Sequence, residues 1–191
     1  RELIDGVLRI NERSEAELTE EAVRITGLEN PNSVAQLKRW LEGRLGVGNE
    51  LPDLAKETVS TLLSRTDLPP EVRRVLEIRQ QLSKTSIKKY VAMEAARCED
   101  DRIRGLTQYY GANRTGRWAG RLVQMQNLPR NYIKTLDYAR KLAKAGNFEG
   151  LRLLYGNVPD TLSQLIRTAF LPSEGRKFVV ADFSAIGARV I

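Results

Sequence analysis

Apolar residues at helical spacing are the feature that most constrains the fold of this 191-residue chain. Between Glu71 and about Arg97 no glycine or proline interrupts the pattern, and apolar side chains recur every three or four positions. They are Val72, Val75, Leu76, Ile78, Leu82, Ile87, Tyr90 and Val91. The segment therefore predicts one uninterrupted helix of about 25 residues.

Further amphipathic segments predict shorter helices elsewhere in the chain. They lie at residues 1–26, 34–41, 53–64 and 131–160, the last of which predicts one or two helices. Gly27 is expected to end the first helix, and Asn32 or Ser33 to cap the second. The stretch 43–52, which contains glycine, asparagine and proline, predicts a flexible connection.

Two short runs predict strands. Residues 105–110 alternate in the manner of a strand. Residues 178–181 are β-branched, aromatic or small and contain no polar side chain, which predicts a buried strand of a sheet covered on both faces. Ser184 can cap a helix that follows it. The sequence as a whole predicts an α+β fold, mostly α, with long antiparallel helices and a small antiparallel sheet.

The composition excludes several kinds of site. The chain contains no histidine, so a Ser-His-Asp or Cys-His catalyst and a histidine-bound zinc are excluded. Its one cysteine, Cys98, cannot form an internal disulfide and indicates a reducing compartment. No apolar run approaches the ~20 residues of a membrane span, and no signal peptide opens the chain. We therefore expect a cytoplasmic protein without a membrane partner.

Positive charge is concentrated in the middle of the chain. Residues 61–134 carry 15 Lys and Arg against 7 Asp and Glu, a net charge of +8, whereas residues 1–60 carry 8 against 12. Such a segment is expected of a surface that faces a polyanion. Within it, cations and hydroxyls alternate at Lys84, Thr85, Ser86, Lys88 and Lys89. This pattern fits phosphate contacts, and a solvated basic face on a helix is the alternative.

Asp182 directly follows the predicted strand at 178–181. A carboxylate at a strand-to-helix junction is held rigidly, which suits a ligand of a divalent metal. The alternative is an aspartate whose oxygens are satisfied by nearby backbone amides. The residues alone leave both possibilities open.

The sequence from Asp182 to Arg189, Asp-Phe-Ser-Ala-Ile-Gly-Ala-Arg, resembles the first palm motif of the family A DNA polymerases, the bacterial polymerase I class and its phage relatives. The family pattern is Asp-Tyr-Ser-x-Ile-Glu-x-Arg, from which this chain departs at Phe183 and Gly187. Further family-like segments precede it in the same order. They are Asn-Pro-Asn-Ser-Val-Ala-Gln-Leu at 30–37, Thr-Gly-Arg at 115–117, Gln-Asn-Leu-Pro at 126–129 and Ile-Arg-Thr-Ala-Phe at 166–170.

The resemblance implies a division of the chain. Residues 1–50 would be a helical lead-in to the polymerase thumb, 51–100 the thumb helices and 101–191 the N-terminal part of the palm. Residues 131–160 look like a helical insertion, because the bacterial enzymes have a much shorter link there. The small antiparallel sheet would then form the first part of the palm.

The resemblance also implies roles for individual residues. Arg117 would reach the minor groove at the primer terminus, with Gln126 and Asn127 contacting the duplex nearby. The basic and hydroxyl residues on the long helix would grip the phosphates of the duplex; these are Lys84, Thr85, Ser86, Lys88 and Lys89. Arg130 and Gly187 would lie near the nucleotide, although the family often places its arginine two residues after the proline and Arg130 directly follows Pro129.

In the family, two Mg²⁺ ions bridge paired aspartates and the triphosphate. Here Asp182 and the backbone carbonyl of Phe183 would be the ligands, and the second carboxylate motif is absent from these 191 residues. We therefore expect a fragment of a template-directed DNA polymerase that is inactive alone. Its partners would be primer–template DNA, deoxynucleoside triphosphates and the remainder of the polymerase, in a bacterial or phage-infected cell.

Two alternatives keep the same residues in other roles. A non-catalytic helical module that binds DNA or RNA would use the same basic segment. A helical interaction domain could instead bind an acidic protein. The sequence that follows Ile191 in the gene distinguishes the polymerase from the binding module, and a nucleic-acid titration at varied salt separates the interaction domain.

Gly187 generates a first prediction. The family glutamate would complete a Ser-x-x-Glu capping box with Ser184, and glycine adds a helix-interior penalty of up to ~1 kcal/mol. Gly187→Glu should therefore raise the melting temperature of this chain. In the family the same glutamate disfavours a ribose 2′-hydroxyl, so glycine in a full-length polymerase should weaken discrimination against ribonucleotides. Unchanged melting and unchanged sugar selection with glutamate would contradict both parts.

Overall fold

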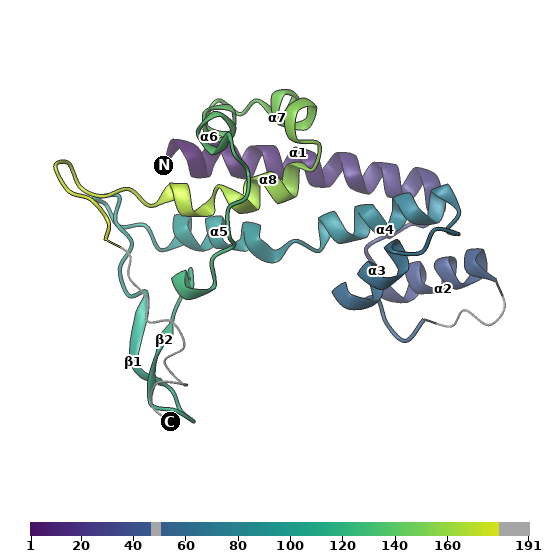
Figure 1. Cartoon of the computed structure of the whole chain (residues 1–191), viewed down its shortest axis with the longest axis horizontal. Coiled ribbons are helices and arrows are strands. Elements are labelled where there is room, and N and C mark those ends of the chain that lie inside the picture. Colours follow the sequence, from purple (N-terminus) through teal and green to yellow (C-terminus); the bar gives the residue numbers. More distant parts are fainter. Residues whose placement is uncertain (47–50, 180–191) are drawn as a thin grey trace.

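The computed structural model describes residues 1–46 and 51–179. They form a mostly helical molecule with one small two-stranded antiparallel sheet, which confirms the predicted fold class. Figure 1 shows the helices gathered into an elongated body and the two strands projecting from one end of it. None of the described helices has both the length and the hydrophobicity needed to cross a membrane.

Helix α1 (Glu2–Thr26) is the longest element and ends as predicted at Gly27, which adopts the left-handed conformation with φ 69°. Its apolar face packs against α4, α5, α6, α7 and α8. In Figure 1, α4 and α5 run beneath α1 in the opposite direction. The predicted antiparallel arrangement is therefore present, with α1 as the long helix, and α1 contacts helices from both halves of the chain.

Helices α2 (Val34–Leu45), α3 (Lys56–Leu63) and α4 (Pro70–Leu82) share one hydrophobic core. Its buried members are Leu37, Leu41, Leu51, Leu54, Val59, Leu62, Leu68, Val72, Val75 and Leu76. Helix α2 begins at the predicted position, although the Ser33 side chain makes no capping hydrogen bond. It also runs through Gly43 to Leu45, so the beginning of the expected flexible connection is helical.

The prediction of one uninterrupted helix from 71 to 97 is wrong. Helix α4 ends at Leu82, a single 3₁₀ turn, η1, covers Thr85–Ile87, and α5 spans Lys88–Ala95. The Ser83 hydroxyl donates to the carbonyl of Gln80, and Lys84 takes an extended conformation with ψ 99°. Serine and threonine favour such local bonds over a helix interior, and the periodicity of apolar residues does not register them.

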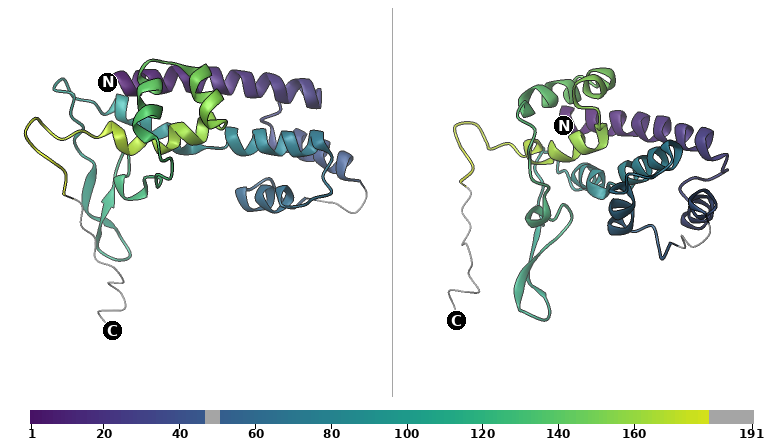
Figure 2. Two further views of the ribbon diagram at one scale, coloured as in Figure 1. Left: turned by 45° about the horizontal axis from the view of Figure 1, so that its top comes forward. Right: turned by 45° about the vertical axis from the view of Figure 1, so that its right-hand side comes forward.

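A second hydrophobic core joins the first half of α1 to α5 and to three helices near the end of the described chain. These are α6 (Leu136–Lys144), α7 (Phe148–Tyr155) and α8 (Val158–Gln164), followed by the 3₁₀ turn η3 (Ile166–Ala169). Asn147 and Asn157 cap α7 and α8 by accepting the amides of Gly150 and Asp160. The views in Figure 2 show α6 and α7 lying against α1, so the stretch 131–160 belongs to the core of the molecule.

The sheet is a β-hairpin of β1 (Thr107–Ala112) and β2 (Arg117–Gly120). The predicted strand at 105–110 is confirmed with its bounds shifted by two residues, and the second strand comes from the glycine-rich sequence that follows. Phe178 and Val179 lie in no strand and are 60% and 82% exposed. The predicted buried strand is therefore wrong for these two residues, because no described strand pairs with them. Residues 180 and 181 lie outside the described residues.

The contact between α1 and α6 generates a prediction. A Cβ atom added to Gly6 would lie 2.0 Å from the carbonyl oxygen of Ala143. Gly6→Ala should therefore push the two helices apart, at a cost of ~1–3 kcal/mol that exceeds the gain of up to ~1 kcal/mol in helix propensity. Urea unfolding of the variant measures the change.

Gly43→Ala is the matched control. Gly43 also lies within a helix, but an added Cβ would meet nothing within 4 Å. Only the propensity gain remains there, so this variant should be more stable than the original chain. Equal effects of the two substitutions would contradict the close contact at Gly6.

Candidate nucleic-acid interface

The hairpin and the segment after it carry an uncompensated positive charge. Residues 102–136 contain seven Lys and Arg and no Asp or Glu. Arg104 pairs with Asp100 at 2.5 Å. The guanidinium groups of Arg114, Arg117, Arg121 and Arg130 are in exposed residues and have no hydrogen-bond or ion-pair partner among residues 1–46 and 51–179. Four such cations in one short segment form a surface suited to phosphates.

The turn of the hairpin fixes where Arg117 lies. Arg117 is the first residue of β2 and pairs with Ala112 across the sheet. Gly116 has φ +66°, and a Cβ there would approach the ring of Tyr110 to 2.6 Å. Only glycine tolerates both the backbone conformation and the contact. The glycine of the Thr-Gly-Arg sequence therefore sets the direction in which β2 starts and presents the exposed Arg117.

Gln126 and Asn127 lie in η2 (Met125–Asn127), the short 3₁₀ turn after β2. The flanking residues Val123 and Leu128 are buried, whereas Gln126 and Asn127 are exposed. A Cβ on Gly120 would lie 2.1 Å from Oε1 of Gln126, so this glycine makes room for the glutamine side chain. Two apolar anchors thus hold a turn that exposes both residues, although Nδ2 of Asn127 also donates to Oε1 of Gln124 at 3.3 Å.

The chain after this turn is held by two side chains that the sequence analysis did not assign to the site. Arg167 donates from Nε to the carbonyl of Pro129 at 2.9 Å and from Nη2 to that of Leu128 at 3.1 Å. The buried Gln164 accepts the amides of Tyr132 and Ile133 at 2.9 and 3.0 Å. Arg167 belongs to the Ile-Arg-Thr-Ala-Phe sequence, which marks it only as part of a family-like segment. Nothing in the sequence around Gln164 indicates its role.

The five polar residues at 84–89 fall into two groups. The Lys84 ammonium pairs with Asp160 at 2.5 Å, and Lys89 donates to the carbonyl of Val123 at 2.6 Å. The hydroxyls of Ser86 and Ser163 are hydrogen-bonded at 3.1 Å. Thr85 and Lys88 are exposed, and their side chains have no partner within the described part of the chain. Lys88 and Thr85 can therefore reach an external phosphate without breaking an internal bond.

Asp160 connects three elements around a groove of about 550 Å³. It accepts hydrogen bonds from Lys84, from the Tyr132 hydroxyl and from Gln164. Burial raises the pKa of its carboxyl, but the hydrogen bonds and the Lys84 charge outweigh burial and hold the pKa below the ordinary value. The hydrogen bond to Asp160, together with burial, raises the pKa of Tyr132 to about 12.

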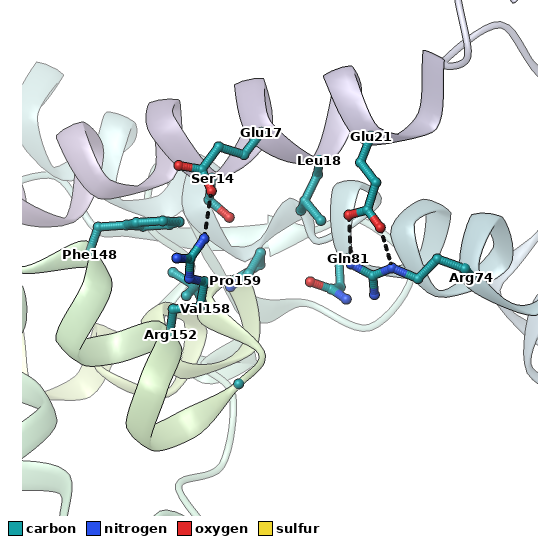
Figure 3. Close-up of a pocket in the computed structure, with 11 residues that line it drawn as sticks. Ser14, Glu17, Leu18, Glu21, Arg74, Gln81, Phe148, Arg152, Val158 and Pro159 are labelled. Carbon is teal, nitrogen blue, oxygen red and sulfur yellow. Dashed lines mark hydrogen bonds and ion pairs between the residues drawn. The ribbon is translucent and has the colours of Figure 1, made fainter. Parts of the chain in front are cut away.

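A second pocket, of about 160 Å³, lies where α1, α4, α7 and α8 meet (Figure 3). Glu21 forms two hydrogen bonds with Arg74, at 2.7 and 2.8 Å, and Arg152 pairs with Glu17 at 3.1 Å. Figure 3 shows these two ion pairs on either side of Leu18. Because the charges pair with one another, this pocket is a polar contact between helices and not a reactive site.

Asp182, Phe183 and Gly187, the residues predicted for the metal and the nucleotide, lie outside the described residues. Among residues 1–46 and 51–179, no group of three or more Asp, Glu or Cys side chains is placed to hold a metal ion. The candidate residues that the structure describes therefore lie on the hairpin, on η2 and at the junction between α4 and α5.

The sequence is 56% identical over 190 residues to a DNA polymerase of Bacillus phage SP02. The alignment covers 100% of this chain and 29% of that polymerase, so the chain spans less than a third of the relative's length. No family model matches the sequence, and no solved structure matches it.

The Asp160 cluster generates a prediction. Asp160→Asn keeps the size of the side chain but removes the charge that Lys84 and Tyr132 contact, and should lower the free energy of unfolding by ~1–3 kcal/mol near neutral pH. Because folding lowers the pKa of this carboxyl, its charge stabilises the folded state at pH values above the ordinary pKa of about 4. That contribution is lost as the pH falls through the lowered pKa. The gap in melting temperature between the two proteins should therefore narrow below about pH 4.

Asp137→Asn is the control, because Asp137 is exposed and makes no ion pair within the described residues. Tyrosine absorbance gives a second measurement: the pKa of Tyr132 should fall from about 12 toward ~10 in Asp160→Asn. A pKa of Tyr132 that stays near 12 in Asp160→Asn would contradict the hydrogen bond between Tyr132 and Asp160.

Proposed function

We propose that this chain is the thumb and the first part of the palm of a family A DNA polymerase, in which it holds the primer–template duplex. The observation that carries the proposal is the 56% identity over the whole chain to a phage DNA polymerase. The family-like sequences at 115–117, 126–129 and 182–189 support the assignment to family A. The uncompensated charge of residues 102–136 supports a DNA surface.

The proposed division is a helical lead-in at 1–50, thumb helices at 51–100 and the N-terminal part of the palm at 101–191. This division is proposed for function and does not describe packing units, because each hydrophobic core contains residues from more than one of the three parts. One core combines α2, α3 and α4, and the other combines α1 with α5 and the helices of 131–160. In this proposal the lead-in and the thumb move as parts of one packed body.

The proposed DNA contacts separate into those that position and those that reach the bases. Lys88 and Thr85 contact phosphates at the start of α5, while Arg117, Gln126 and Asn127 face the minor groove. Lys84 and Lys89 support this surface from within: Lys84 fixes the break between α4 and α5 through Asp160, and Lys89 ties α5 to the segment before Gln126.

Asp182 is the proposed metal ligand, with the backbone carbonyl of Phe183 beside it. Two Mg²⁺ ions would activate the primer 3′-hydroxyl and neutralise the leaving pyrophosphate in the complete polymerase. The described residues add no cluster of carboxylates to this pair, so a second carboxylate must come from the remainder of the polymerase. The 191 residues alone should bind primer–template DNA and not extend it.

The test is a titration of labelled primer–template duplex at several salt concentrations. Lys88→Ala combined with Arg117→Ala should lower the affinity by tenfold or more. The dependence of log K on log salt should become shallower by about 1 for each phosphate that the variant no longer binds. Lys84→Ala should mainly lower the melting temperature, because its ammonium is paired with Asp160.

Arg24→Ala combined with Lys141→Ala is the matched control, since both residues are exposed cations on other helices and the pair removes the same charge. The control should leave the slope unchanged. Binding that ignores salt, or an equal loss in the control, would refute the proposed surface.

A further inference from the structure

Three aromatic side chains stand exposed on the hairpin. Tyr109, Tyr110 and Trp118 are 72%, 60% and 64% exposed. The rings of Tyr109 and Trp118 lie edge to face with centroids 5.3 Å apart, and those of Tyr109 and Tyr110 are 6.3 Å apart. The three rings therefore form one continuous aromatic surface, although none of them is buried in a core.

The backbone is shaped to hold this surface. Tyr110 has φ 52°, which is unusual for a bulky residue. It lies in a bulge between Gln108 and Ala112, where the register of the hairpin shifts. A Cβ on Gly111 would come within 2.6 Å of the Cβ of Ala119, so the two strands approach closely there. A backbone strained around exposed rings points to a function for those rings.

The surroundings of the rings decide what they bind. A two-stranded hairpin with both faces open is marginally stable by itself, so a partner is expected to cover it. Arg114 and Arg117 lie between Tyr110 and Trp118 in the sequence, and their guanidinium groups lack partners among the described residues. A polyanion with flat apolar rings matches both features at once, and single-stranded nucleic acid is such a ligand.

We propose that Tyr109, Tyr110 and Trp118 form a stacking site for unpaired bases of single-stranded DNA, with Arg114 on an adjoining phosphate. Bases inside a duplex have both faces covered by their neighbours, so an aromatic side chain can stack only on an unpaired or terminal base. The inference rests on the proposed function, because the ligand is the unpaired strand that adjoins the duplex. It adds a contact for single strands to a surface proposed for duplex DNA.

The test compares labelled single-stranded oligothymidylate with a long blunt duplex, in which the terminal base pairs are a small share of the binding sites, using the 191-residue chain. Tyr109→Leu combined with Trp118→Leu should lower the affinity for the single strand about tenfold, as expected when one or two bases no longer stack. The salt dependence should persist, and the affinity for the duplex should change by less than about twofold. Tyr138→Leu removes an exposed aromatic ring of α6 and is the matched control.

Fluorescence gives an independent readout. The chain has two tryptophans, so Trp40→Phe leaves Trp118 as the sole tryptophan emitter. Its emission should be quenched by the single strand and not by the duplex. Thermal unfolding of the double variant confirms that the substitutions leave the helical body folded.

The outcomes separate the two proposals. If the original chain binds neither ligand, the proposed function fails and the stacking site with it. If the original chain binds both the single strand and the duplex in a salt-dependent way, and the double variant binds them with equal affinity, only the stacking site is refuted. If the single strand binds but leaves the Trp118 emission unchanged, the stacking site is also refuted. The aromatic surface would then be a contact surface for a protein.

Discussion

The burial of one face of α1 is the constraint on which the rest of the structure depends. Leu3, Val7 and Ile10 lie in the core shared with α5 and the last three helices, and Leu18 and Ala22 meet Ile78 of α4. Each buried side chain of this size contributes about 1.5–3 kcal/mol relative to exposure. Because one continuous helix enters both contacts, the two ends of the molecule cannot move independently without exposing apolar surface. The proposed DNA residues at the start of α5 are thereby fixed relative to those near the hairpin.

A second, polar framework underlies the proposed interface. Asp160, Gln164 and Arg167 follow one another through α8 and η3, and they bind the α4–α5 junction and the segment 128–133. Irregular backbone is costly to hold in place unless its amides and carbonyls find partners. These side chains supply partners from within, while Arg117, Lys88, Gln126 and Asn127 remain exposed. An interface of exposed cations thus depends on the buried Gln164, the half-buried Asp160 and the exposed Arg167, which hold its backbone in place.

The sequence predicted those parts of the fold that depend on local chemistry. Gly27 ends α1 because the residue after the helix adopts a positive φ, which glycine does without steric cost. The periodic apolar face is enough to place α1 itself. The break at Ser83 escaped the same reasoning because apolar periodicity does not register the local hydrogen bond of Ser83, and because Lys84 pairs with Asp160, which lies 76 residues later. Lys89 likewise bonds to Val123, 34 residues away. Alternation of cations and hydroxyls predicted that this whole segment binds phosphate, but could not separate Lys84 and Lys89, which have internal partners, from the exposed Thr85 and Lys88. Strand β2 was missed because it is only four residues long and Ala119 and Gly120 have low strand propensity, so that pairing with β1 decides its conformation.

The stretch 131–160 is interpreted as an insertion from the family resemblance, but its helices belong to a hydrophobic core of the molecule. By comparison with bacterial polymerases it looks like an insertion, yet Ala139, Ala143 and Leu151 are fully buried against the rest of the molecule. Gly6 of α1 has no side chain where the carbonyl of Ala143 approaches, so the two helices are fitted to each other. A protein with a shorter link would expose this face of α1 to water unless other residues covered it. Helix α1 and the helices of 131–160 therefore form one structural unit, and a substitution that alters the contact surface of one requires a compensating substitution in the other.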